Sequence, residues 1–177
     1  MVEIDDVTIK RAACGSSRAF KALYECYAPF LWKVIYRTIQ ADPHAAAEVL
    51  QQSYIRAYSA LKKFKFDSAF STWLYRITYN TALTYVIKAQ KRNQRHTQLS
   101  EIAQDKAADR LSDKDMVSRI FAGLSAEERF VLTAREISGL TYEEIADIVG
   151  KAPGALRTAM HRLKARLREE YKYEYQS

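Results

Sequence analysis

The stretch that decides the fold of this chain is TYEEIADIVGKAPGALRTAMHRLKARL, residues 141–167. A small residue, Ala146, lies within an apolar helical pattern, and Gly150 follows four positions later. Glycine adopts the left-handed backbone that a sharp turn needs, and a small residue lets a second helix pack closely. Six positions further on, Leu156 supplies an apolar anchor, and Pro153 suits the first turn of the second helix. The spacing therefore predicts a helix-turn-helix.

The second helix of this motif presents a polar face rich in cations. Arginine can bond guanine through two donors in the major groove, while threonine, histidine and lysine can contact bases or phosphates. We predict that this face binds DNA through Arg157, Thr158, His161, Arg162 and Lys164. A plain helical hairpin with a basic surface is the alternative.

The rest of the chain also has helical patterns. Its 177 residues include only 5 glycines and 3 prolines, and no stretch alternates as a half-buried strand would. Apolar residues recur at steps of three and four over about residues 17–40, 45–64 and 68–92. Capping-box sequences begin at Ser125 and Thr141. The fold class expected is all-α.

A polar, weakly patterned segment at residues 93–111 divides the helical blocks. Such a composition buries too little apolar surface to order itself, so we expect a flexible linker. The expected organisation is two small helical domains, residues 1–92 and 112–177, the second containing the helix-turn-helix.

Charge is unevenly distributed along this chain of net charge +7. Residues 56–95 contain nine basic side chains and one acid, whereas residues 99–147 contain six basic and eleven acidic ones. Residues 151–168 contain six basic side chains and no acid. A run of like charges is as often a solvated face as a binding surface. Here, however, one basic segment coincides with the aromatic stretch and the other with the helix-turn-helix.

One outward stripe of the second helical block combines a carboxylate, two amides and an apolar residue. This mixture indicates a partner surface rather than a purely solvated face, although a stray exposed isoleucine would be an ordinary finding. The stripe consists of Glu48, Gln51, Gln52 and Ile55.

Aromatic and basic residues alternate between residues 62 and 80. Aromatic rings stack on unpaired bases at about 1–3 kcal/mol each, and cations follow the phosphates. We therefore expect this segment to hold opened DNA, with Tyr75 and Tyr79 as further candidates and burial in the core as the alternative. The proposed DNA-binding residues are Lys62, Lys63, Phe64, Lys65, Phe66, Trp73, Arg76 and Asn80.

The sequence shows no motif for catalysis of a covalent reaction. The three histidines, His44, His96 and His161, have no metal-ligand spacing, and Cys14 and Cys26 form no CxxC pair. No phosphate-binding loop, signal peptide or apolar run long enough to span a bilayer is present. We expect no catalytic residue, metal or cofactor, and a cytoplasmic, non-enzymatic protein.

Three stretches together resemble the extracytoplasmic-function sigma factors of bacterial RNA polymerase, of the envelope-stress sigma-E type. They are AEVLQQSYIRAYSALKKF, FSTWLYRITYNTAL and LTYEEIADIVG…GALRTAMHRLKARLRE, and the resemblance covers about residues 20–169. It implies that the first domain docks on core polymerase and opens the promoter −10 element, while the second reads the −35 element.

The resemblance also implies roles for particular segments. Glu48 and Gln51 match the surface that docks on the clamp helices of the largest polymerase subunit, and the flap is a further implied contact. Residues 64–70 match the loop that captures a flipped −10 base, with Trp73 and Asn80 just behind it. An anti-sigma protein, often a segment of a membrane protein, is the implied inhibitor.

The chain departs from the family pattern at several positions. Gln52 replaces a usual acid, residues 152–155 read APGA where the family has PVGT, and Ala159 replaces a usual arginine. These differences leave the −35 sequence open. The rival functions are a free-standing helix-turn-helix regulator, a nucleic-acid enzyme and a helical adaptor.

Overall fold

The computed structural model describes residues 4–40, 42–97 and 113–171, and within these ranges it has eight α-helices and no strand. The all-α prediction is therefore confirmed. The helices are α1 (Asp6–Ala13), α2 (Ser17–Ile39), α3 (Pro43–Ala60), α4 (Phe70–Thr97), α5 (Asp113–Ala122), α6 (Ala126–Glu136), α7 (Tyr142–Val149) and α8 (Pro153–Glu170), with a 3₁₀ turn at Leu61–Lys63.

Helix starts follow the capping chemistry of the sequence. At α3, Asp42 accepts a hydrogen bond from the Ala45 N–H at 2.9 Å, and Pro43 occupies the first turn. Both predicted capping boxes form, at the N-termini of α6 and α7. Each box satisfies backbone donors that have no partner within the helix, so the starts of these helices are fixed by local sequence.

Two segments differ from expectation. Helix α1 was not predicted; it begins after Asp5, whose carboxylate accepts from the Thr8 N–H at 2.8 Å. Helix α4 continues to Thr97, five residues into the predicted linker, because its last turns are rich in lysine, arginine and glutamine, which favour helix. The remainder of the predicted linker lies outside the described residues.

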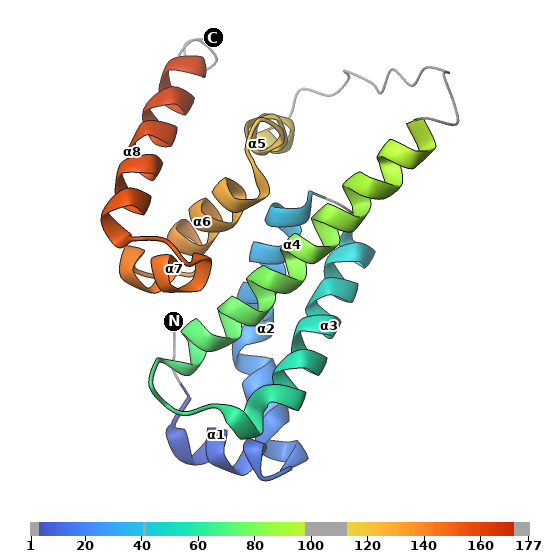
Figure 1. Cartoon of the computed structure of the whole chain (residues 1–177), viewed down its shortest axis with the longest axis vertical. Helices are drawn as coiled ribbons and strands as arrows, with labels where there is room; N and C mark the ends of the chain where they lie inside the picture. The colour runs from blue at the N-terminus through green and yellow to red at the C-terminus, as the bar shows by residue number, and fades with distance from the viewer. Residues whose placement is uncertain (1–3, 41, 98–112, 172–177) are drawn as a thin grey trace.

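Helices α2, α3 and α4 lie side by side in the first domain, and α1 packs across one end (Figure 1). Their shared core includes Tyr27, Leu31 and Val34 of α2 and Leu74 of α4, all fully buried. Tyr58 follows the buried Tyr54 by four positions, which is the spacing of the core stripe of α3, yet it is 51% exposed. One edge of its ring meets Phe20 of α2, 4.9 Å between ring centroids, and the rest of the side chain stays exposed.

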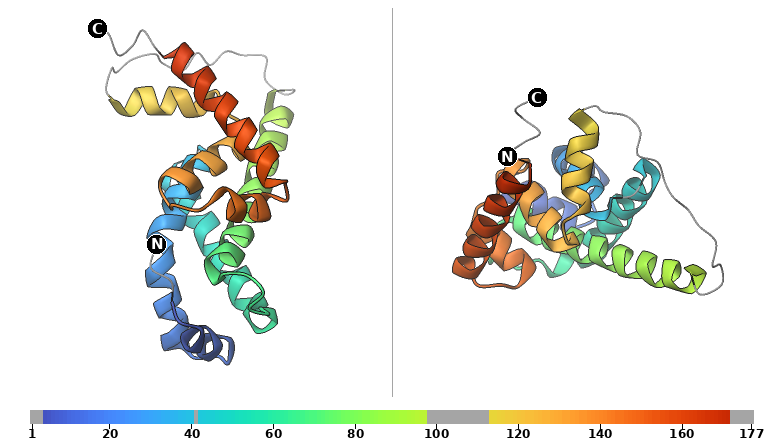
Figure 2. Two further views of the ribbon diagram at one scale, coloured as in Figure 1. Left: turned by 90° about the vertical axis from the view of Figure 1, so that its left-hand side faces the viewer. Right: turned by 90° about the horizontal axis from the view of Figure 1, so that it is seen from above.

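The second domain packs against the first, with α6 on α2 and α7 on α4 (Figure 2). The Tyr75 hydroxyl of α4 donates a hydrogen bond to Ser138 Oγ at 2.7 Å, and both side chains are buried. The Tyr79 ring lies 4.6 Å from the Phe130 ring, centroid to centroid. These contacts make the two domains one packed unit in the described structure.

Arg129 of α6 joins the end of α2 to the turn before α6. Its Nη1 donates to the Thr38 carbonyl at 3.1 Å and its Nε donates to the Leu124 carbonyl at 2.9 Å. Thr38 belongs to the last turn of α2, where carbonyls have no partner within the helix. A cation also suits the negative end of the helix dipole, so Arg129 stabilises both the helix end and the domain contact.

Candidate functional site

The predicted partner stripe lies on the outer face of α3. All four of its side chains are exposed, and Ile55 is 52% exposed, whereas Val49, Leu50, Ser53 and Tyr54 face the core. The exposed residues are Glu48, Gln51, Gln52 and Ile55.

Two aromatic residues extend this stripe, and the sequence analysis missed them. Tyr58 lies three residues after Ile55, on the same side of α3, and Tyr24 of α2 is also exposed. The Tyr24 ring packs on Tyr54 at 4.7 Å between centroids. Exposed aromatics beside an exposed isoleucine are typical of a surface that binds another protein. Their apolar character had suggested burial, so only the packing reveals their exposure.

The loop between the 3₁₀ turn and α4 carries an aromatic cluster. Phe64 is buried, with its ring 5.2 Å from Trp73, 5.6 Å from Phe70 and 4.7 Å from Phe66, centroid to centroid. Phe64 is thus a core residue that supports the loop, rather than an exposed stacking surface. Around the cluster, the cations Lys62, Lys63 and Lys65 are all exposed.

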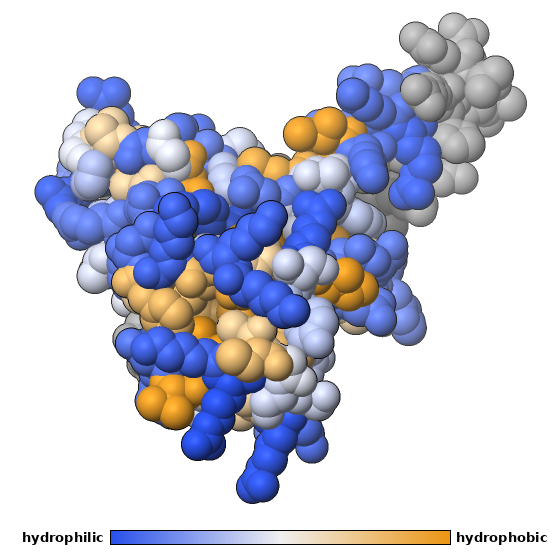
Figure 3. Space-filling model, turned by 60° about the horizontal axis from the view of Figure 1, so that its bottom comes forward, coloured by the Kyte–Doolittle hydropathy of each residue, from blue (hydrophilic) through white to orange (hydrophobic). Residues whose placement is uncertain are grey.

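Phe66 is the exposed ring of this loop. Its φ of +60° lies in the left-handed region, which is unusual for a bulky residue and costs about 1–3 kcal/mol. The ammonium of Lys10 lies 5.1 Å from the ring centroid, and a cavity of about 90 Å³ beneath the loop is lined by Asp6, Phe66 and Ser68 among others. Viewed from this end of the molecule, apolar and hydrophilic side chains alternate (Figure 3).

The three predicted DNA-binding residues of α4 differ in their surroundings. Asn80 is exposed and Trp73 is half-buried, as expected for residues that could meet DNA. Arg76 is also half-buried, but its Nη2 donates to Asp147 Oδ2 of α7 at 2.5 Å. The expected DNA-facing cation is therefore paired with an acid of the second domain in this arrangement.

Tyr75 and Tyr79 are buried beneath the second domain. Burial raises the pKa of each phenol to about 12, and the neighbouring Glu127 carboxylate adds to the shift at Tyr79. In the described structure neither ring is open to stack on a base, because α6 and α7 cover this part of α4. The alternative reading of these two residues, burial, is the one observed.

The helix-turn-helix has the predicted geometry. Gly150 adopts φ +74°, and its N–H donates to the Ala146 carbonyl, so it closes α7. Ala146 and Leu156 are buried, and α8 leaves the turn at Pro153. Four of the five predicted DNA-binding residues are exposed on the outer side of α8, namely Arg157, Thr158, His161 and Arg162. The fifth, Lys164, is half-buried.

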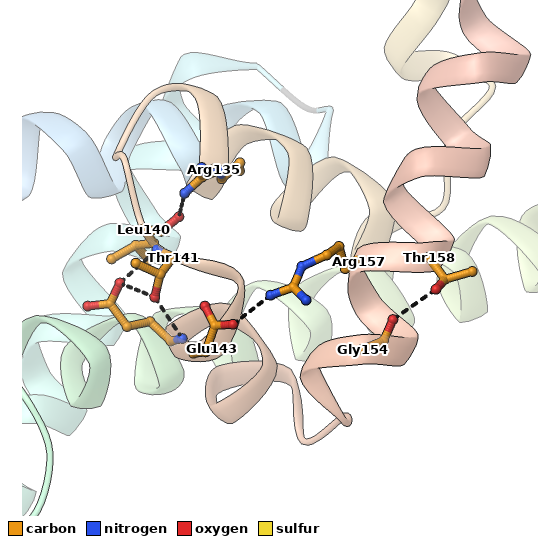
Figure 4. A network of polar contacts seen from close by, with 8 residues as sticks. Arg135, Leu140, Thr141, Glu143, Gly154, Arg157 and Thr158 are labelled. Atoms are coloured by element: carbon orange, nitrogen blue, oxygen red, sulfur yellow. Dashed lines mark hydrogen bonds and ion pairs between the residues drawn. The ribbon is translucent and has the colours of Figure 1, made fainter.

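Polar contacts connect α8 to the helices behind it (Figure 4). Arg157 Nη2 donates to Glu143 Oε1 at 2.7 Å, and Lys164 Nζ donates to Glu136 Oε1 at 2.6 Å. Thr158 Oγ1 donates to the Gly154 carbonyl of its own helix at 3.0 Å. Arg157 and Lys164 therefore meet acidic side chains of α7 and α6.

No helix in the described ranges has both the length and the apolar character needed to cross a membrane.

Family comparisons agree with this two-part organisation. Residues 23–92 match the family described as Sigma-70 region 2, and residues 114–167 match Sigma-70, region 4. The first match contains most of α2, all of α3, the loop and most of α4, and the second contains the helix-turn-helix. The two matches therefore contain the segments on which all the predicted binding residues lie.

Curated relatives match nearly the whole chain. The chain is 32% identical to the ECF RNA polymerase sigma-E factor of Salmonella typhimurium (strain LT2) and 31% identical to that of Escherichia coli (strain K12), covering 90% of this chain and of each relative. It is 31% identical to the RNA polymerase sigma-H factor of Pseudomonas aeruginosa, covering 92% of this chain and 91% of that relative.

Solved structures share the fold. The structure of CnrH in complex with the cytosolic domain of CnrY matches with a TM-score of 0.73 at 23% identity, over 94% of this chain and 96% of that chain. The sigma factor RpoE in complex with the anti-sigma factor NepR from Bartonella quintana matches with a TM-score of 0.66 at 22% identity, over 86% and 96%. With these domains, relatives and folds in agreement, the chain belongs to the extracytoplasmic-function sigma factors of bacterial RNA polymerase.

Proposed function

We propose that this sigma factor docks on core RNA polymerase through α3, opens the −10 element with the loop and α4, and reads the −35 element with α8. The observation that carries this assignment is the presence, in one chain, of an exposed stripe of mixed polar and apolar residues on α3 and a separate helix-turn-helix. A regulator that acts only by occupying DNA needs the second feature and has no use for the first.

The docking surface consists of the stripe on α3 together with Tyr24 and Tyr58. Ile55 and Tyr58 supply apolar contact area, while Glu48 and Gln51 supply acceptors and donors at its border. Interfaces commonly combine an aromatic or aliphatic centre with a polar rim. We assign the clamp helices of the largest subunit as its partner, with the polymerase flap as the contact of the second domain.

The −10 function rests on the loop and on the exposed part of α4. Phe66 and the lysines around it offer a ring and phosphate partners, and Asn80 offers amide hydrogen bonds. Extracting a base from a duplex costs a few kcal/mol, which stacking and hydrogen bonds of this kind can offset. Phe64 supports the loop from beneath, and Trp73 in the first turn of α4 packs against its ring.

The −35 function rests on the outer face of α8. Its cations can contact phosphates along the duplex, and Arg157 lies near the helix start, where recognition helices contact base edges. Sequence-independent attraction to phosphates then adds to direct base contacts. Binding drives strand opening, so the protein itself catalyses no covalent step, needs no cofactor and acts in the cytoplasm with the polymerase.

An anti-sigma protein is the proposed inhibitor. Two solved neighbours of the same fold are complexes, one with an anti-sigma factor and one with the cytosolic domain of another protein. The exposed stripe of α3 is a surface that such an inhibitor would have to cover in order to exclude the polymerase. A membrane-anchored inhibitor would keep the sigma factor at the membrane, although the sigma factor has no spanning helix of its own in the described residues.

The test is co-elution of the purified chain with bacterial core RNA polymerase. We expect the parent to co-elute and the Glu48→Lys, Gln51→Ala variant to be lost from the complex, because both side chains are exposed and neither supports the core. Glu169→Lys, which makes the same charge change at the end of α8, is the control and should co-elute. Absence of binding by the parent, together with specific binding to duplex DNA, would instead favour the free-standing regulator.

A further inference from the structure

Arg157 is held by two neighbouring residues of α7. Its Nη2 donates to Glu143 Oε1 at 2.7 Å (Figure 4). Its guanidinium carbon lies over the Tyr142 ring, 5.9 Å from the centroid. Lys164 of α8 also has an acidic partner, Glu136, but its ammonium cannot form the two parallel bonds that a guanidinium offers to guanine. Arg157 thus has a defined direction although its side chain is 60% exposed.

The two residues that hold Arg157 lie on a fixed platform. Thr141 and Glu144 form the capping box that starts α7, and Ile145 behind it is fully buried. A second guanidinium, that of Arg135, lies 5.2 Å from the Tyr142 ring centroid. Because α7 is anchored on both sides of Tyr142 and Glu143, these residues can fix the direction of a side chain on the neighbouring helix.

The remaining donors of Arg157 are available for a ligand. Glu143 accepts from one N–H of Nη2, so the other Nη2 N–H remains, together with the donor beside it on Nη1 or Nε, to form the two parallel bonds that guanine O6 and N7 require. A free arginine loses much rotamer freedom when it binds, and a guanidinium that is already directed loses less. The carboxylate therefore prepares the side chain for a base edge without occupying the donors that read it.

We propose that Glu143 is a positioning residue that directs Arg157 to a single guanine of the −35 element. The proposal rests on the assignment of α8 as the −35 reader. Glu143 is acidic and lies near the DNA-binding face, so its own interaction with phosphates is repulsive. Its contribution is selectivity, obtained at the expense of general affinity.

The opposite interpretation is that Glu143 merely competes with DNA for Arg157. The two interpretations predict different consequences when the charge is removed. If Glu143 is only a competitor, its neutralisation strengthens binding to every sequence and leaves the preferred base unchanged. If Glu143 positions Arg157, its neutralisation weakens the preference at one base pair even though the electrostatic attraction to DNA increases.

The experiment uses holoenzyme assembled from core polymerase and the full chain, with a pool of promoter fragments randomised over the −35 element. Bound fragments are sequenced for the parent and for the variants Arg157→Ala, Glu143→Gln and Glu136→Gln. Glu136→Gln is the matched control, because it removes the same charge beside Lys164, whose ammonium is a point charge without the planar fork that pairs with a base edge. Circular dichroism verifies that each variant is folded.

The expected result is that Arg157→Ala abolishes the preference for guanine at one position and Glu143→Gln reduces it at the same position by about threefold to tenfold. Glu136→Gln should keep the parent preference. If Glu143→Gln retains the parent preference while Arg157→Ala loses it, the positioning role is refuted and the −35 assignment stands. If Arg157→Ala changes no preference, Arg157 does not read a base, and both the positioning role and the assignment of Arg157 to −35 reading are refuted.

Discussion

Replacing Tyr75 by phenylalanine removes one hydroxyl from the contact between the two domains. This hydroxyl donates to Ser138 Oγ at 2.7 Å, and Tyr75 and Ser138 are 0% and 4% exposed. Without it, Ser138 loses its hydrogen-bond partner in a place that water does not reach, which costs about 1–3 kcal/mol of unfolding free energy. The ring and its packing stay unchanged, so the loss reports on the hydrogen bond alone.

Urea unfolding followed by tryptophan fluorescence measures this loss. Both tryptophans, Trp32 and Trp73, belong to the first domain, whereas Ser138 belongs to the second. At a typical denaturant slope, a loss of this size lowers the midpoint by roughly 1 M urea. Ser138→Ala should lower the same first-domain midpoint, because its side chain stabilises α4 across the domain boundary.

A double-mutant cycle separates the contact from unrelated effects. The Tyr75→Phe, Ser138→Ala variant should be less destabilised than the sum of the single variants by about 1 kcal/mol or more. Tyr85→Phe, which removes the same group further along α4, is the control and should change stability by less than about 0.5 kcal/mol. Additive single effects, or a Ser138→Ala variant with the parent midpoint, would show that the domains do not meet through this contact in solution.

Three further outcomes are expected. Gly150→Ala should destabilise the second domain by about 1–2 kcal/mol, because φ at Gly150 is +74°. Gly154→Ala in α8 should stabilise the domain slightly, because the added methyl group meets no neighbour; thermal unfolding compares the two variants. Burial raises the pKa values of Tyr75 and Tyr79 to about 12. The stabilisation that comes from keeping these phenols protonated is therefore fully present below pH 10, the pKa of an unfolded tyrosine, and should be lost between pH 10 and 12. In urea unfolding measured across this pH range, Tyr79→Phe should reduce the dependence of the unfolding free energy on pH. Asn80→Ala should bind polymerase like the parent but open the −10 region poorly, as measured by permanganate reactivity of unpaired thymines; an unchanged reactivity would contradict a role for Asn80 in opening.

Local sequence signals predicted the second domain most completely. The capping boxes at Ser125 and Thr141, the left-handed Gly150 and the apolar anchor Leu156 all act within a few residues of one another. Their chemistry is short-range, so the chain order alone carries it. The outer face of α8 follows directly, because burying Leu156 fixes which residues point away.

The sequence predicted the exposure of polar residues in the first domain better than that of aromatic residues. The stripe from Glu48 to Ile55 was predicted correctly as exposed, because polar residues at helical spacing seldom face a core. The aromatic residues were harder to place. Apolar character favours burial for any tyrosine, and nothing in the local pattern distinguishes the exposed Tyr58 from the buried Tyr75.

By itself, the sequence determined helices α2–α4 and α6–α8, the capping boxes, the helix-turn-helix and the family resemblance, since each depends on residues close together in the chain. Only the tertiary structure decided that Tyr75 and Tyr79 are covered by α6 and α7, that Arg76 meets Asp147, and that Glu143 contacts Arg157. The first two are contacts across the domain boundary, between residues 48 or more positions apart. Their formation depends on how complete domain surfaces fit together, which no local pattern of residues encodes.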